Sequence, residues 1–172
     1  MEILLSKPTN KIGKAIIEAE KIADGEATYC HVAIKIGKRV YESLIFGGVS
    51  SRDYELAYRN VPHDLFDINV ALMPQLNEER ARVYLEGLIG KFRGLYGFSK
   101  IPLMLSDAIA SFIVRKRVFW FTKTFRIKSF PICSSLVGKV LNKFGEPDLP
   151  ELFKDWKGLN PDDFETIVER MI

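Results

Sequence analysis

The chain has 172 residues and carries 25 basic and 22 acidic side chains, which gives a formal net charge of +3. This near balance argues against nucleic-acid binding, because that activity is typical of strongly basic surfaces. Hydrophobic residues make up 47% of the sequence and charged residues 27%, a mixture that can bury a core. We therefore predict one globular domain over residues 1–172.

The N-terminal third of the chain is predicted to form a strand, a helix and a hairpin. Residues 3–6 have the character of a short strand, and residues 11–23 have the apolar spacing of an amphipathic helix. The side chains that this spacing turns inward are Ile12, Ala15, Ile16, Ala19 and Ala23. The hairpin follows over residues 31–44.

The hairpin pattern consists of two alternating runs joined by Gly37 and Lys38. A glycine at the first position of a two-residue loop suits a type II′ turn. In that register His31 and Glu42 become diagonal neighbours on one face, roughly 7 Å apart. The pairs that define the register are Ile36 with Arg39, Lys35 with Val40, and Ala33 with Glu42.

The remaining elements complete an α+β pattern, in which an antiparallel sheet packs against helices. Residues 47–62 are predicted to form a loop with a short helical turn, and residues 65–73 alternate like a strand. Helices are predicted from Asn77 to about Arg93 and over residues 102–114. Residues 118–127 are rich in aromatic and β-branched side chains and are predicted to add one or two strands.

Cys133 opens a run over residues 133–141 in which apolar side chains recur at helical spacing. A thiol at a helix start is easily activated, because the positive end of the helix favours the thiolate and lowers its pKa from about 8.5. The alternative is a small buried thiol that only packs. We predict that packing role for Cys30, which should point away from His31. His63 is expected on the surface, in a loop.

Several segments, taken in order, resemble the circularly permuted NlpC-like hydrolases of the papain-like superfamily. The matching segments are residues 9–16, 29–34, 40–43, 47–49, 95–98, 132–137 and 159–164. The resemblance implies a papain-like fold in which Cys133 is the nucleophile, His31 the base and Glu42 the residue that orients the imidazole. No cofactor is predicted, and no metal either, because two separated cysteines and two histidines without ligand spacing do not build a zinc site. Tyr96 and Ser134 are the residues expected to contact the substrate.

The chain departs from this family at residues that concern substrate choice. Gly97 replaces an acid that often follows the tyrosine, and Ser135 stands where a glutamate often follows the nucleophile. A basic and aromatic insertion over residues 112–128 has no family counterpart. Within it we predict a contact with phosphate or an anionic membrane surface at Arg115, Lys116 and Arg117.

The predicted function is that of a cysteine hydrolase that cleaves an amide bond, in a cell-wall peptide or a related molecule, through an acyl-thioester intermediate. One alternative is an acyl hydrolase or acyltransferase of the same fold that acts on lipids. It predicts that the chain sediments with vesicles until residues 115–117 are neutralised. The other alternative is a structural or interaction module without activity, in which Cys133 labels like an ordinary thiol.

The sequence also bears on location. The N-terminus lacks a signal-peptide pattern, and the longest apolar stretch, residues 101–114, is too short to span a bilayer. Two cysteines do not form a disulfide framework, so a reducing, cytoplasmic location is the default expectation. Delivery by a virus particle or a secretion machine would leave no such signal.

Overall fold

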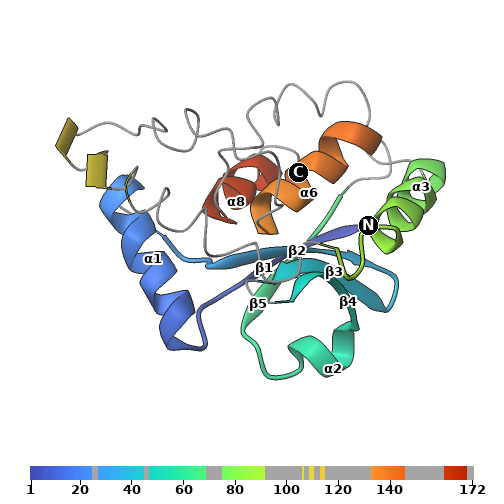
Figure 1. Ribbon diagram of the computed structural model, residues 1–172, viewed down its shortest axis with the longest axis horizontal. Helices are drawn as coiled ribbons and strands as arrows, with labels where there is room; N and C mark the ends of the chain where they lie inside the picture. Colours follow the sequence, from blue (N-terminus) through green and yellow to red (C-terminus); the bar gives the residue numbers. More distant parts are fainter. Residues whose placement is uncertain are drawn as a thin grey trace.

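The computed structural model describes residues 1–24, 27–44, 47–68, 75–91, 133–145 and 161–169, with Ser106, residues 109–110 and residues 113–114. Within them, five antiparallel strands form one sheet with the order β4-β3-β2-β1-β5. The strands are β1 (Glu2–Ser6), β2 (His31–Ile36), β3 (Arg39–Leu44), β4 (Gly48–Asp53) and β5 (His63–Asp67). The predicted combination of an antiparallel sheet with helices is confirmed (Figure 1).

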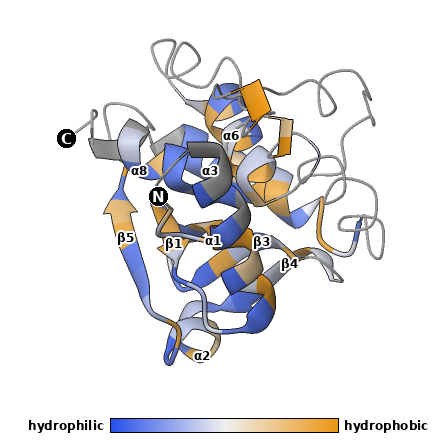
Figure 2. Ribbon diagram, turned by 90° about the vertical axis from the view of Figure 1, so that its left-hand side faces the viewer, coloured by the Kyte–Doolittle hydropathy of each residue, from blue (hydrophilic) through white to orange (hydrophobic). Residues whose placement is uncertain are grey.

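The two faces of the sheet carry different helices. The larger hydrophobic core lies on the face covered by α3 (Gln75–Glu86), α6 (Cys133–Phe144) and α8 (Pro161–Glu169). The opposite face packs against α2 (Tyr54–Tyr58), and Figures 1 and 2 both show α2 below the sheet and α6 above it. The central strands therefore bury both of their faces, which explains their continuous apolar runs.

The hairpin of β2 and β3 forms in the predicted register. Lys35 pairs with Val40 and Ile36 pairs with Arg39. Gly37 has a φ of 57°, a left-handed value that glycine adopts at little cost in a tight two-residue turn. This register carries Glu42 toward the end of β2 where His31 lies.

The predictions for residues 47–73 need two corrections. Residues 48–53, predicted to belong to a loop, form β4, which pairs with β3 along its whole length. Its sequence is polar, so the backbone pairing and not a hydrophobic pattern makes it a strand. Strand β5 begins at His63 and ends at Asp67, whereas the predicted strand ran from Leu65 to Met73. His63 is thus half-buried in a strand, and not in a loop.

Helix α1 (Lys11–Asp24) forms where predicted, but its inward face is different. Ile12 is 47% exposed and Ala15 is also exposed, whereas Gly13, Ile17 and Glu20 are buried. The reason is close packing at Gly13, where an added Cβ would lie 3.0 Å from both Pro8 Cβ and Cys30 Sγ. The helix therefore turns its glycine, and not its most apolar stripe, toward the rest of the chain. The side chains of residues 19 and 23 lie outside the described part.

Helix α3 ends at Glu86, well before the predicted end near Arg93. The chain then turns, and Gly90 adopts a φ of 77°. The predicted strands of residues 118–127 and most of the predicted helix of residues 102–114 lie outside the described residues. No helix in the described part of the chain is both long enough and apolar enough to cross a bilayer.

Candidate active site

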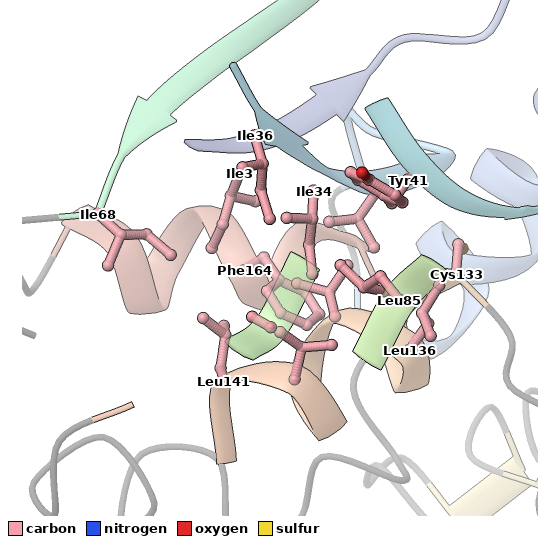
Figure 3. Packing of buried hydrophobic residues seen from close by; sticks show 14 of the residues in the cluster. Ile3, Ile34, Ile36, Tyr41, Ile68, Leu85, Cys133, Leu136, Leu141 and Phe164 are labelled. Atoms are coloured by element: carbon pink, nitrogen blue, oxygen red, sulfur yellow. The ribbon is translucent and has the colours of Figure 1, made fainter. Parts of the chain in front are cut away.

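Cys133 is the first residue of α6 and lies at one margin of the larger core. Helix α6 packs on β2 and β3, and this packing directs its N-terminus toward the end of the sheet where β2 begins. In Figure 3 Cys133 and Tyr41 lie at one end of the packed cluster, and Ile68 lies at the other. The Cys133 residue is 8% exposed, so the thiol is close to the surface but largely shielded from water.

His31, the first residue of β2, connects Cys133 to Glu42. Its Nε2 lies 2.9 Å from Glu42 Oε2, and its side chain is hydrogen-bonded to that of Cys133. Because Nε2 faces the carboxylate, Nδ1 is the ring nitrogen available to the thiol. Burial by itself lowers the pKa of His31, but the charge and hydrogen bond of Cys133, followed by those of Glu42, raise it to about 10. This surrounding favours a charged imidazolium at neutral pH.

Glu42 lies on β3 and is 1% exposed, and both of its carboxylate oxygens accept hydrogen bonds. Arg52 binds Oε1 through Nε at 2.7 Å and through a terminal nitrogen at 2.6 Å. The hydroxyl of Tyr58 donates to Oε2 at 2.9 Å, beside His31. Burial raises the pKa of Glu42, but hydrogen bonds and opposite charges from His31 and Arg52 outweigh it and leave the pKa lowered. The carboxylate is therefore held ionised.

Charge is balanced along this chain of side chains. Arg52 compensates Glu42, and an imidazolium at His31 would compensate the thiolate form of Cys133, whose charge raises the pKa of His31. A buried charge is tolerated only when it is paired and hydrogen-bonded. The set of four groups meets this requirement, since each positive group contacts a negative one.

Replacing Glu42 with alanine is expected to lower the free energy of unfolding by about 3 kcal/mol, because it leaves His31, Arg52 and the Tyr58 hydroxyl without their acceptor. Urea denaturation at neutral pH measures this loss. The pKa of Glu42 is lowered in the folded state, so its contribution is present above pH 4.5 and is lost as the pH falls through the lowered pKa. The exposed Glu55→Gln variant on α2 is the control, and a similar loss there would contradict the prediction.

The other residues singled out in the sequence do not take part in this series of contacts, or lie outside the described residues. Ser134 lies on α6 and is 1% exposed. Its contact with a substrate stays a prediction. Cys30 Sγ lies 3.6 Å from the carbonyl oxygen of Ser6, and burial is the largest cause that raises its pKa, to about 11. This environment suits the predicted packing role. Tyr96 and the basic cluster at residues 115–117 lie outside the described residues.

Two residues of the site, Arg52 and Tyr58, were not predicted. Arg52 reaches Glu42 because β4 pairs Ser50 with Glu42, which makes Arg52 a diagonal neighbour of Glu42 across the two strands. Tyr58 lies on α2, against the face of the sheet that carries Glu42. No sequence motif marks either residue. Had residues 48–53 been recognised as a strand, the diagonal rule could have found Arg52.

No family model, curated protein or solved structure matches this chain significantly. Among the described residues, no three His, Cys, Asp or Glu side chains are grouped so that they could hold a metal ion. The side chains of the site have a chemistry of their own. They form a thiol at a helix start, an imidazole hydrogen-bonded to it, and a buried carboxylate behind the imidazole.

Proposed function

We propose that this chain is a cysteine hydrolase with a permuted papain-like fold, in which Cys133, His31 and Glu42 act together. The observation that carries the proposal is the continuous hydrogen-bonded series from the thiol through the imidazole to the buried carboxylate. A nucleophile, a base and a group that orients the base are the three roles that such catalysis needs. Arg52 and Tyr58 are positioning residues, since they act on Glu42.

In the first step the Cys133 thiolate attacks the carbonyl carbon of the substrate, and a carbon–sulfur bond forms. The negative charge that develops on the carbonyl oxygen can be met by backbone N–H groups at the start of α6. The imidazolium of His31 then gives its proton to the leaving amine, and the bond between the carbonyl carbon and that amine breaks. An acyl thioester on Cys133 and a neutral imidazole remain.

In the second step water releases the acyl group. Neutral His31 takes a proton from a water molecule as its oxygen attacks the thioester carbon. The carbon–sulfur bond breaks, the carboxylic acid leaves, and the thiolate and imidazolium are restored. Glu42 keeps the imidazole in one orientation throughout, because Nε2 stays hydrogen-bonded to the carboxylate.

We propose an amide in a cell-wall peptide or a related molecule as the first substrate class, on the strength of the family resemblance. The experiment that tests the function is acid-quenched mass spectrometry of the chain after mixing with cell-wall peptides, lipid esters and acyl thioesters. We expect one substrate class to add its acyl mass to the peptide that contains Cys133, with release on longer incubation. A chain that gains no acyl mass from any class would contradict the proposal, and the identity of the acylating class distinguishes amide from lipid substrates.

A further inference from the structure

A buried carboxyl group on α1 is not used by the proposed chemistry. Glu20 is 8% exposed, and as an ionised carboxylate it has no hydrogen-bond donor for either of its oxygens. Oδ2 of Asp162, at the start of α8, is likewise buried without a partner. Ionised carboxylates only accept hydrogen bonds, so two of them cannot satisfy each other. A single proton changes this, because a protonated carboxyl becomes a donor.

The other oxygen of Asp162 holds the segment that leads into β2. Asp162 Oδ1 accepts the backbone N–H of Thr28 at 2.8 Å and that of Tyr29 at 3.1 Å. His31 follows two residues after Tyr29. Helix α8 also packs on β1 and β2, so this carboxylate joins the start of the helix to the strand that carries the imidazole.

We propose that Glu20 and Asp162 share one proton, and that this shared proton fixes Asp162 so that it positions the segment carrying His31 beside Cys133. Protonated Glu20 donates to Asp162 Oδ2, while Oδ1 keeps its two backbone N–H groups. Glu20 is a positioning residue, since it acts through Asp162. The role at His31 rests on the proposed hydrolase function, whereas the shared proton does not.

The electrostatic surroundings favour the protonated form of Glu20. Burial, and then the charge and hydrogen bond of Asp162, raise the pKa of Glu20 to about 10, with further contributions from Cys133 and Asp163. Cys30, in the segment before β2, is also coupled to Glu20 and Asp162, and both raise its pKa. These neighbours from α6, α8 and the segment before β2 are all acids or thiols. Each disfavours a second negative charge at this position.

The sign of the pH dependence follows from the raised pKa of an acid. The unfolded chain releases the Glu20 proton near pH 4.5, whereas the folded chain keeps it until about pH 10. The folded state therefore binds one more proton between these values, and stability falls as the pH rises through this window. This direction is opposite to that of Glu42, whose lowered pKa makes stability fall as the pH drops.

Urea denaturation of wild type and Glu20→Gln across this pH window tests the shared proton. The glutamine amide can donate to Asp162 Oδ2 without titrating, so we expect the variant to have the higher midpoint in alkaline solution, by roughly 1 M urea. The difference should vanish toward pH 4.5. Glu18→Gln is the matched control, because Glu18 is exposed on the same helix and pairs with Lys21. A Glu20→Gln curve parallel to wild type would overturn the proposal.

The positioning role needs a separate measurement on the same protein. The alkylation rate of Cys133 at neutral pH should fall several-fold in Glu20→Leu and be restored in Glu20→Gln, because only glutamine supplies the missing donor. Equal rates in both variants would overturn positioning. An ordinary thiol rate in wild type would instead count against the hydrolase function, and the urea experiment would still decide whether the proton is shared.

Discussion

Replacing Cys133 with alanine is expected to abolish hydrolysis of whichever substrate acylates the wild-type chain, with a loss on the order of 10³-fold or more. In the proposed mechanism the thiol forms the acyl intermediate, and neither the imidazole nor the carboxylate can replace it in that role. Steady-state product release and acid-quenched mass spectrometry measure the effect. The fold should survive, since alanine retains the Cβ and removes one sulfur atom from the margin of the core.

Cys30→Ala is the matched control for this experiment, because it removes the other cysteine of the chain. Cys30 contacts the carbonyl of Ser6 and has a raised pKa, so its loss should leave the turnover number nearly unchanged. Far-ultraviolet circular dichroism of both variants should match wild type. Full activity in Cys133→Ala, or an equal loss in a folded Cys30→Ala, would show that the nucleophile lies elsewhere.

Replacing His31 with glutamine is expected to change the pH at which Cys133 reacts with iodoacetamide. In wild type the imidazolium stabilises a thiolate, so alkylation should proceed well below pH 8. Without the imidazolium, the rate should follow the profile of an ordinary thiol with a midpoint near 8.5. We expect hydrolysis to fall on the order of 10³-fold as well, because the leaving group then has no proton donor.

The difference in folding stability between wild type and the His31→Gln variant should change with pH in a defined direction. The pKa of His31 is raised in the folded state, so its contribution is fully present below pH 6.5 and is lost as the pH rises through about 10. His63→Gln is the control, since His63 on β5 is hydrogen-bonded to Tyr54 and to the carbonyl of Val61. Identical alkylation profiles for His31→Gln and wild type would remove His31 from the proposed mechanism.

The sequence predicted the neighbourhood of His31 and Glu42 because local rules decide it. A two-residue turn at Gly37 fixes the register of β2 and β3, and side-chain alternation then fixes the shared face. The start of α6 at Cys133 was predictable for a similar reason, since apolar spacing resumes at that residue. Such features depend on residues close together in the chain.

Other parts of the site depend on contacts between distant segments, and the sequence pattern did not reveal them. Strand β4 is polar and forms because β3 offers it a free edge, so Arg52 gave no signal as the partner of Glu42. Helix α1 was rotated in the prediction because hydrophobic spacing favoured Ile12, whereas Gly13 permits the closer packing. That rotation is also what buries Glu20.

The contact between His31 and Cys133 has a consequence for the timing of proton transfer. Burial lowers the pKa of His31, and its interaction with Cys133 is the largest of the influences that raise it. When sulfur becomes part of a thioester its charge disappears, and the imidazole loses its main reason to hold a proton. Bond formation at sulfur would thus convert the same ring from proton donor to proton acceptor, with no movement of the backbone required.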